Sequence, residues 1–278
     1  MRPVALTIAG SDSGGGAGIQ ADLKTFFALG VHGTCALTSV TSQNTSGVIS
    51  RFDLPAEVVV SQVEAVASDL EPAAVKTGML ATAEVVRAVA GLAESLGWEK
   101  LVVDPVVISS SGHPLLEDSG IGVLLEKLLP RSLVFTPNLA EASLLTGIDV
   151  VGPGEMRKAA RILHSRGART VVVKGGHLGG NEALDVFFNG KDYHELRTTR
   201  VNTADDHGTG CVFSAAVAAY LALGREPLEA VRGAKDFVTR ALARSLRLGR
   251  GRGPVNPACA ADTANGAWVK DRERKEGR

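Results

Sequence analysis

The apolar positions of this chain fall into two kinds of segment that follow one another in turn. Some segments repeat apolar residues every three or four positions, as a helix with one buried face does, and others are short unbroken apolar runs. Unbroken runs are typical of strands in a parallel sheet that helices cover on both faces. We predict helices over 56–70, 82–96, 119–129, 154–166 and 227–246, and strands over 74–77, 101–103, 133–135 and 170–173. This order predicts an α/β fold with a mostly parallel sheet.

The beginning of the chain and the region after the last of these strands depart from that repeat. An apolar run over 4–9 leads through a glycine-rich loop into a helix, and is predicted to be the first strand. Two short strands over 34–43 and 48–52 flank a turn, and we expect this hairpin to form a flap over the glycine-rich loop. A second antiparallel hairpin is predicted at one edge of the sheet, over 184–188 and 193–197.

The most apolar predicted helix follows the segment 206–211, which reads Asp-His-Gly-Thr-Gly-Cys, and ends near Gly224. Its first turn would offer unpaired N–H groups and a partial positive charge, and Gly208 and Gly210 would let an anion approach the main chain. We expect the helix start to lower the pKa of the Cys211 thiol, so that its thiolate could accept a proton, although a bound phosphate would oppose that shift. The segment alone is equally compatible with a glycine-rich helix start and a buried structural cysteine.

Polar residues come directly at the ends of several predicted strands, where ligands bind in α/β sheets. Lys174 could neutralise a phosphate there, and Asp104 with Glu141 could direct carboxylates at hydrated Mg²⁺. Each residue also has a structural alternative: a strand-end lysine, a turn aspartate and, for Asn138 with Glu141, a helix capping box. A lysine, two carboxylates and a helix N-terminus around one cavity are the parts that phosphoryl transfer needs.

Composition narrows the range of partners. The 30 Lys and Arg residues balance the 30 Asp and Glu residues, so no overall charge favours nucleic acid or an anionic membrane. No apolar run is long enough for a membrane span, and the three cysteines show neither zinc-ligand spacing nor a disulfide framework. No P-loop motif occurs, and the dinucleotide fingerprint around the first glycines is weak. We therefore expect a cytoplasmic protein that acts on small molecules.

Several motifs, in order, make the chain resemble the hydroxymethylpyrimidine/phosphomethylpyrimidine kinases of thiamine biosynthesis. They are residues 9–25, 43–45, 76–80, 136–138, 174–177 and 207–211. The resemblance implies a ribokinase-like three-layer α/β/α fold, ATP and Mg²⁺ as cofactors, and a homodimer. It also implies phosphorylation of 4-amino-5-hydroxymethyl-2-methylpyrimidine and then of its monophosphate. We expect one kinase domain over 1–258, followed by a charged, disordered tail over 259–278.

The resemblance further implies roles for single residues. The pyrimidine pocket would be lined by Gly10, Asp22, Gln43, Met79 and Val106, with Cys211. Asp22 and Gln43 would hydrogen-bond the aminopyrimidine, and Met79 and Val106 would pack against its ring. ATP and its metal would be held by Lys174, Thr209, Asn138, the amides of Gly208 and Gly210, Asp104 and Glu141.

Two other functions remain open from the sequence. A pyridoxal kinase of mixed specificity would also bind a flat heteroaromatic ring that bears a hydroxymethyl group. A catalytically silent pyrimidine-binding regulator would keep the pocket but not the phosphoryl-transfer groups, and the presence of Lys174 and of the 208–211 turn argues against it.

Overall fold

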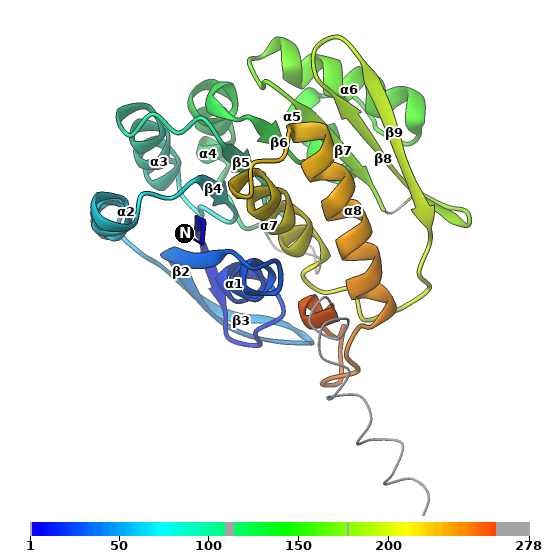
Figure 1. Cartoon of the computed structure of the whole chain (residues 1–278), viewed down its shortest axis with the longest axis horizontal. Coiled ribbons are helices and arrows are strands. Elements are labelled where there is room, and N and C mark those ends of the chain that lie inside the picture. The colour runs from blue at the N-terminus through cyan, green and yellow to red at the C-terminus, as the bar shows by residue number, and fades with distance from the viewer. Residues whose placement is uncertain (1, 109–113, 177, 260–278) are drawn as a thin grey trace, which may run out of the picture.

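All strands that the structure describes join one sheet (Figure 1). The computed structural model describes residues 2–108, 114–176 and 178–259, and in these ranges the strand order is β3-β2-β1-β4-β5-β6-β7-β8-β9. The strands are β1 (Val4–Asp12), β2 (His32–Asn44), β3 (Gly47–Asp53), β4 (Ala74–Thr77), β5 (Leu101–Val103), β6 (Val134–Phe135), β7 (Val171–Gly175), β8 (Glu182–Phe188) and β9 (Tyr193–Thr199). The pairs from β2 to β7 are parallel and the outer pairs are antiparallel, which confirms the predicted mostly parallel sheet.

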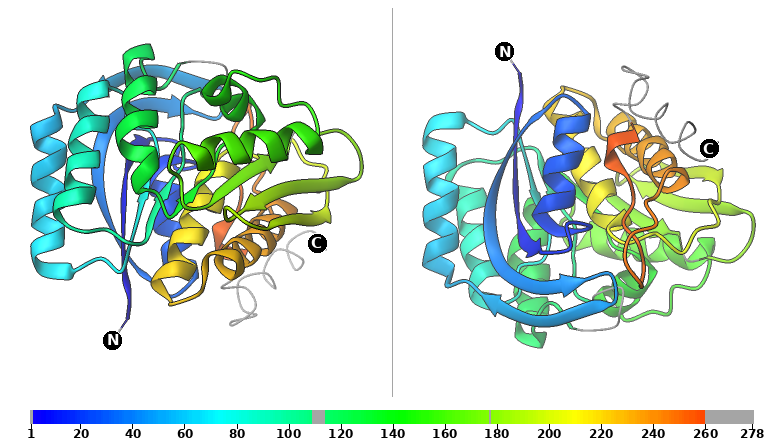
Figure 2. Two further views of the ribbon diagram at one scale, coloured as in Figure 1. Left: turned by 90° about the horizontal axis from the view of Figure 1, so that it is seen from above. Right: turned by 90° about the horizontal axis from the view of Figure 1, so that it is seen from below.

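Helices cover both faces of the sheet, as the two further views show (Figure 2). They are α1 (Gly18–Ala28), α2 (Ala56–Leu70), α3 (Ala83–Ser95), α4 (Asp118–Val123), α5 (Leu139–Thr146), α6 (Pro153–Ser165), α7 (Thr209–Ala222) and α8 (Pro227–Ala243). One apolar cluster joins the sheet to α2, α3, α5 and α6, and another joins it to α1, α7 and α8. The predicted helix over 119–129 is present but irregular, because α4 passes into a π-helical turn over Leu124–Leu128.

The short strands explain why their sequences are unbroken apolar runs. In β5, Leu101 and Val103 belong to the cluster on one face of the sheet, whereas Val102 belongs to the cluster on the other. Neighbouring β6 divides in the same way, with Phe135 on one side and Val134 on the other. Since successive side chains of a strand point to opposite faces, a sheet covered on both faces needs apolar residues at every position.

The predicted flap differs from expectation in its length and origin. β2 has 13 residues, so it is no short strand; its first part pairs with β1 in parallel and its last part pairs with β3. The hairpin is therefore continuous with the main sheet, and its tip extends beyond the carboxyl end of β1. A register shift between Ser42 and Gln43 bends this extension.

Helix α7 is buried as predicted, and residues 212–221 are all buried. Its N-cap, Gly208, has φ +83°, and a Cβ there would lie 1.8 Å from the carbonyl oxygen of Gly16. The glycine-rich loop and the start of α7 are thus in direct backbone contact, which only glycine at 208 allows.

The predicted tail lies almost wholly outside the described residues. Its first member, Cys259, is described and is buried against the cluster that contains α8. In the described part of the chain, no helix is long and apolar enough to cross a membrane.

Candidate active site

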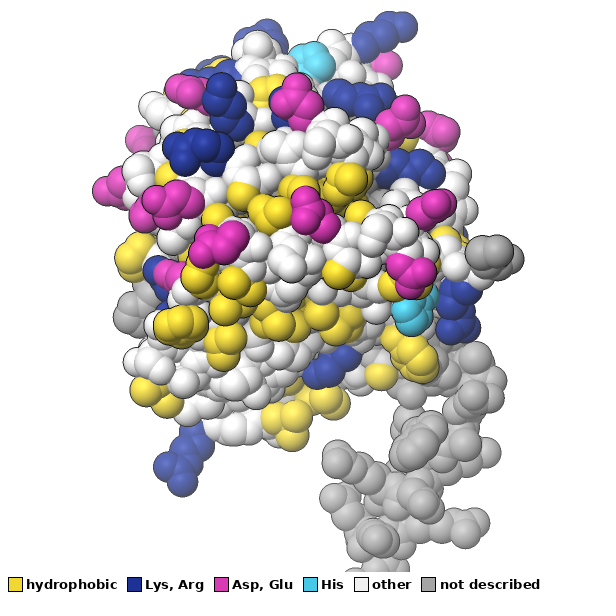
Figure 3. Space-filling model, turned by 90° about the vertical axis from the view of Figure 1, so that its left-hand side faces the viewer, with side chains coloured by type: hydrophobic (Ala, Val, Ile, Leu, Met, Phe, Trp, Pro, Cys, Tyr) yellow, Lys and Arg dark blue, Asp and Glu magenta, His cyan; other side chains and the backbone are white. Residues whose placement is uncertain are grey.

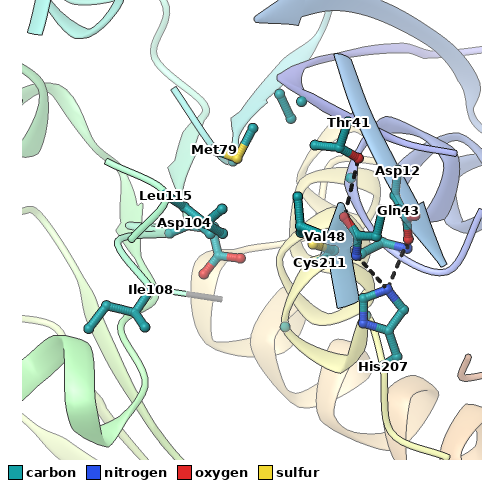
Figure 4. Close-up of a pocket in the computed structure, with 18 of the residues that line it drawn as sticks. Asp12, Thr41, Gln43, Val48, Met79, Asp104, Ile108, Leu115, His207 and Cys211 are labelled. Atoms are coloured by element: carbon teal, nitrogen blue, oxygen red, sulfur yellow. Dashed lines mark hydrogen bonds and ion pairs between the residues drawn. The ribbon is translucent and has the colours of Figure 1, made fainter. Parts of the chain in front are cut away.

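A pocket of about 480 Å³ opens at the carboxyl edge of the parallel strands (Figure 4). Its walls come from the ends of β1, β4, β5 and β7, from the turn of the β2–β3 hairpin, and from the first turn of α7. The volume lies in the range of small-molecule sites. Most residues that the sequence singled out line this pocket: Gly10, Gln43, Met79, Asp104, Val106, Asn138, Glu141, Lys174, Gly208, Gly210 and Cys211.

Lys174 and Asp104 form an ion pair on one side of the pocket. Asp104 Oδ1 accepts hydrogen bonds from Lys174 Nζ at 2.7 Å and from Thr136 Oγ1 at 2.9 Å, and its Oδ2 accepts one from Ser214 Oγ at 3.1 Å. Burial alone would lower the pKa of Lys174, but the charges of Asp104 and Glu141 outweigh it and the pKa is raised. The ammonium is therefore charged at neutral pH and faces the pocket.

Asn138 and Glu141 form the predicted capping box at the start of α5. The Asn138 side chain accepts from Glu141 N at 2.9 Å, and Glu141 Oε2 accepts from Asn138 N at 2.8 Å. Both residues also line the pocket, so the structural alternative does not exclude a role in binding. Burial, together with the charge of Asp104, raises the pKa of Glu141 to about 7 although Lys174 opposes the shift. An additional positive charge nearby would therefore stabilise the ionised form of Glu141.

The first turn of α7 brings main-chain groups next to Lys174. A Cβ at Gly210 would lie 3.5 Å from Lys174 Nζ and 3.8 Å from Asp104 Oδ2. Thr209 is not among the lining residues, and its hydroxyl donates to the backbone oxygen of Asp206 at 2.5 Å. The Thr209 side chain therefore stabilises the turn, while the glycines leave its backbone accessible from the pocket.

The expectation that the start of α7 lowers the pKa of Cys211 is wrong. Burial and the charges of Asp22 and Asp104 raise the pKa to about 11, although Lys76 and a hydrogen bond from the Gly18 backbone lower it. Desolvation penalises the thiolate by more than the neighbouring positive groups compensate. Cys211 thus lines the pocket as a thiol at neutral pH.

Asp22, which the resemblance assigns to the pyrimidine, is not among the residues that line the pocket. Its Oδ2 accepts from Lys76 Nζ at 2.7 Å and from Thr7 Oγ1 at 2.6 Å, and its Oδ1 has no partner among the described residues. The lining residue is Lys76, whose side chain is fully buried. No role for Lys76 was predicted from the sequence, although a lysine inside a strand that is buried on both faces is unusual and was the available signal.

Apolar side chains also line the pocket. Met79, Val48, Ile108 and Leu115 border it in Figure 4, and Val106 is a further lining residue. A Cβ at Gly10 would lie 2.5 Å from the Met79 methyl group, so the glycine is what lets Met79 fold over the end of β1. This apolar lining suits a flat heteroaromatic ring.

Two residues without an expected binding role hold the rim of the pocket together. The Asp12 carboxylate accepts hydrogen bonds from the backbone of Gly14, Gly16 and Ala17 and from His207 Nε2, the last at 2.9 Å. Asp12 thereby shapes the glycine-rich loop and ties it to the residue before Gly208.

A cation and a glycine turn at the carboxyl edge of an α/β/α sandwich are the arrangement of ribokinase-like small-molecule kinases. The chain is similar in structure to the pyridoxal kinase of Bacillus subtilis, solved as an ADP complex, with a TM-score of 0.88 and 37% identity over 94% of this chain and 99% of that one. It is also similar to a phosphomethylpyrimidine kinase from Clostridium difficile, with a TM-score of 0.77 and 39% identity over 87% and 100% of the two chains.

Sequence comparison narrows this class. The family model described as phosphomethylpyrimidine kinase matches residues 12–256. The hydroxymethylpyrimidine/phosphomethylpyrimidine kinase of Rhizobium meliloti is 50% identical over 259 residues, which are 92% of this chain and 97% of that protein. The chain belongs to the phosphomethylpyrimidine kinase family, and it is a kinase with the ribokinase-like fold.

Proposed function

We propose that this chain uses ATP to phosphorylate 4-amino-5-hydroxymethyl-2-methylpyrimidine, and then its monophosphate, in thiamine biosynthesis. The observation that carries the proposal is the position of Lys174, which is paired with Asp104 beside the first turn of α7 in a pocket that apolar side chains also line. A phosphate-binding cation and a slot for a flat ring are thereby within reach of the same small molecule. Membership of the family supports the same substrate.

The chain's own residues account for the demands of phosphoryl transfer, which are positioning and neutralisation of charge. Lys174 and the exposed N–H groups at Gly208 and Gly210 hold phosphate oxygens, and Asp104 holds the lysine in place. Met79 and Val106 pack against the pyrimidine ring and Gln43 hydrogen-bonds its edge. Cys211 contacts the attacking hydroxymethyl group as a thiol and takes no proton from it. The hydroxyl proton leaves late in the reaction, and an oxygen of the transferred phosphoryl group accepts it.

Asp22 takes part in this proposal through Lys76. Because its Oδ2 is held by Lys76 and Thr7, Asp22 fixes the ammonium that lines the pocket floor. Its Oδ1 is buried and has no partner among the described residues, so Asp22 acts on the pocket through the lysine and not by direct contact.

ATP and Mg²⁺ fit the other end of the pocket. No group of three or more metal-binding side chains occurs among the described residues, and Mg²⁺ needs none, since it keeps several waters and binds through one or two carboxylates and substrate phosphates. Asp104 and Glu141 are the carboxylates that would hold it, with Asn138 beside them and Thr209 bracing the phosphate turn. When bound, the metal neutralises phosphate charge.

Pyridoxal is a second candidate substrate, because a pyridoxal kinase shares this fold over nearly the whole chain. The two substrates are separated by measuring phosphate transfer from ATP and Mg²⁺ to the pyrimidine and to pyridoxal side by side. We expect the ratio kcat/KM to be higher for the pyrimidine. A higher value for pyridoxal would replace the proposed substrate.

We further propose a cytoplasmic homodimer formed through the β3 edge of the sheet. The two edges differ: on β9, Arg197 pairs with Glu182 and Glu195, whereas β3 carries Ile49 and Phe52, which are 76% and 66% exposed. Figure 3 shows the face that includes this edge, where apolar side chains gather. An apolar edge strand with free backbone groups is a surface that a second copy can cover.

A further inference from the structure

A chain of hydrogen bonds crosses the wall of the pocket between the end of β1 and the start of α7 (Figure 4). Thr41 Oγ1 donates to the backbone oxygen of Ser11 at 2.7 Å. The side-chain amide of Gln43 comes next, with one end 3.2 Å from Thr41 Oγ1 and the other 3.3 Å from His207 Nε2. His207 Nε2 in turn lies 2.9 Å from Asp12 Oδ2.

Both ends of this chain of contacts can only accept a proton. The Ser11 carbonyl takes the single hydroxyl proton of Thr41, so Thr41 has only lone pairs left for Gln43. At the other end, burial would raise the pKa of Asp12, but hydrogen bonds from His207 and from the glycine-rich loop outweigh it and the pKa is lowered. The ionised carboxylate can only accept, so His207 Nε2 faces Asp12 as a donor.

The order of the Gln43 amide follows from these partners. Oxygen and nitrogen of a terminal amide have nearly the same shape, and their positions are assigned from what they contact. The NH₂ group has to face the lone pairs of Thr41, and the oxygen has to face the Nε2–H of His207, whose single proton it shares with the nearer Asp12 Oδ2. The amide is drawn in Figure 4 in the reverse order, which would set two donors against each other at His207. One turn of the amide satisfies both contacts.

The locked amide leaves one N–H and one oxygen lone pair for a ligand. Gln43 lines the pocket, and the network uses one of its two N–H groups and one of its two lone pairs. A 4-aminopyrimidine offers the matching pair, a ring nitrogen that accepts beside an amino group that donates, as adenine does toward an amide. A 4-oxopyrimidine offers the opposite order, a ring N–H beside a carbonyl oxygen. A free amide could turn to bind either ring, whereas a locked one cannot.

We propose that Thr41 and His207 are specificity-determining positioning residues, which lock the Gln43 amide and make the pocket select a 4-aminopyrimidine over the corresponding 4-oxopyrimidine. The inference rests on the proposed function, since it concerns the edge of that substrate. Sites built to hydrogen-bond a ligand reject analogues that leave a buried polar group unpaired. Because the amide cannot turn, the pocket also rejects the 4-oxo ring, although that ring has the same size and shape as the 4-amino ring.

The test compares the binding of two rings by calorimetric titration: 4-amino-5-hydroxymethyl-2-methylpyrimidine and its 4-oxo analogue. Thr41→Val removes the lone pairs that hold the NH₂ group. Thr34→Val is the matched control, because Thr34 also lies on β2 and its hydroxyl donates to a β1 carbonyl, Ala5 O at 3.1 Å, without contacting Gln43. We expect Thr41→Val to reduce the preference for the amino ring roughly tenfold, and Thr34→Val to leave it unchanged.

A second variant tests the other end of the amide. His207→Leu removes the donor that faces the amide oxygen, so it should also reduce the preference, and it serves if Thr41→Val does not fold. An equal loss of affinity for both rings in both variants, with the preference unchanged, would overturn the lock while leaving the substrate assignment intact. Wild-type protein that binds neither ring would instead overturn the proposed function and the lock together.

Discussion

At the scale of single residues, the charged groups of the pocket are buried, and each is stabilised by an oppositely charged partner. Lys174 relies on Asp104, and Lys76 relies on Asp22, which is buried completely. Removing one member of such a pair leaves an uncompensated buried charge, which costs more than an exposed pair contributes. The function of Lys174 must therefore be tested with a readout that separates catalysis from stability.

We expect Lys174→Ala to lower turnover by on the order of a hundredfold or more, because the cation that neutralises the transferred phosphoryl group is lost. The KM for the pyrimidine should change little, since Lys174 contacts phosphate and not the ring. Steady-state kinetics measure both, and Lys158→Ala on the exposed face of α6 is the control. Wild-type turnover in the Lys174 variant would make it a strand-end lysine only.

The raised pKa of Cys211 predicts slow alkylation that accelerates with pH. A thiol reacts as its thiolate, and a pKa of about 11 moves the appearance of thiolate upward from the ordinary range near 8.5. Between pH 7 and 10 the rate of iodoacetamide modification at Cys211, followed by peptide mass spectrometry, should rise about tenfold per pH unit. A plateau below pH 9 would show that the helix start does lower the pKa.

At the scale of elements, α7 joins the core to the chemistry. Its residues 212–221 are buried, while its first turn forms one wall of the pocket. The same helix has a left-handed glycine at each end, Gly208 with φ +83° and Gly224 with φ +85°. Only Gly208 is in backbone contact with another segment. An alanine at 224 therefore measures the cost of the left-handed conformation alone, whereas an alanine at 208 adds the cost of the clash with Gly16.

Gly208→Ala should destabilise the fold more than Gly224→Ala. Both variants force alanine into the left-handed region, at a cost of about 1–2 kcal/mol. A Cβ at 208 also meets the Gly16 carbonyl oxygen at 1.8 Å, whereas a Cβ at 224 meets nothing within 4 Å. Denaturant unfolding should show the larger loss for Gly208→Ala, together with reduced turnover. An equal decrease in the free energy of unfolding for the two variants would mean that the loop at Gly16 moves aside at no energetic cost.

At the scale of the whole molecule, the two sheet edges predict how copies associate. Phe52→Glu places a charge on the exposed β3 edge and should convert a dimer to a monomer in light scattering at micromolar concentration. Val151→Glu is the control, because Val151 is 75% exposed but lies before α6. A wild-type monomer, or a dimer that survives Phe52→Glu, would contradict an interface at β3.

Much of the fold follows from local pattern, and what does not follow depends on contacts between distant residues. The bounds of α2, β4 and β5 match the predicted ranges, because buried apolar runs and helical periods are local signals. The capping box of α5 was also readable, since its two residues are three positions apart. These features need no knowledge of the rest of the molecule.

The candidate site was predictable as a set of residues but not as a set of interactions. Asp22 and Lys76 are far apart in sequence, and nothing local indicates that the lysine faces the pocket while the aspartate supports it. The pKa of Cys211 depends on how deeply α7 is buried and on carboxylates from other elements, so the local helix argument gave the wrong sign. The hairpin of β2 and β3 was predicted, but the parallel pairing of β2 with β1 along most of its length joins residues far apart in the sequence and was not.

The central claim is that one pocket carries out both phosphorylations. The direct measurement incubates the protein with ATP, Mg²⁺ and unphosphorylated 4-amino-5-hydroxymethyl-2-methylpyrimidine, and follows the products by mass spectrometry over time. The account predicts that the monophosphate appears first and is then converted to the diphosphate, with one ADP released for each phosphate transferred, and that Lys174→Ala slows both steps. Release of ADP without a phosphorylated pyrimidine, or no transfer to the pyrimidine under conditions in which pyridoxal is phosphorylated, would contradict it.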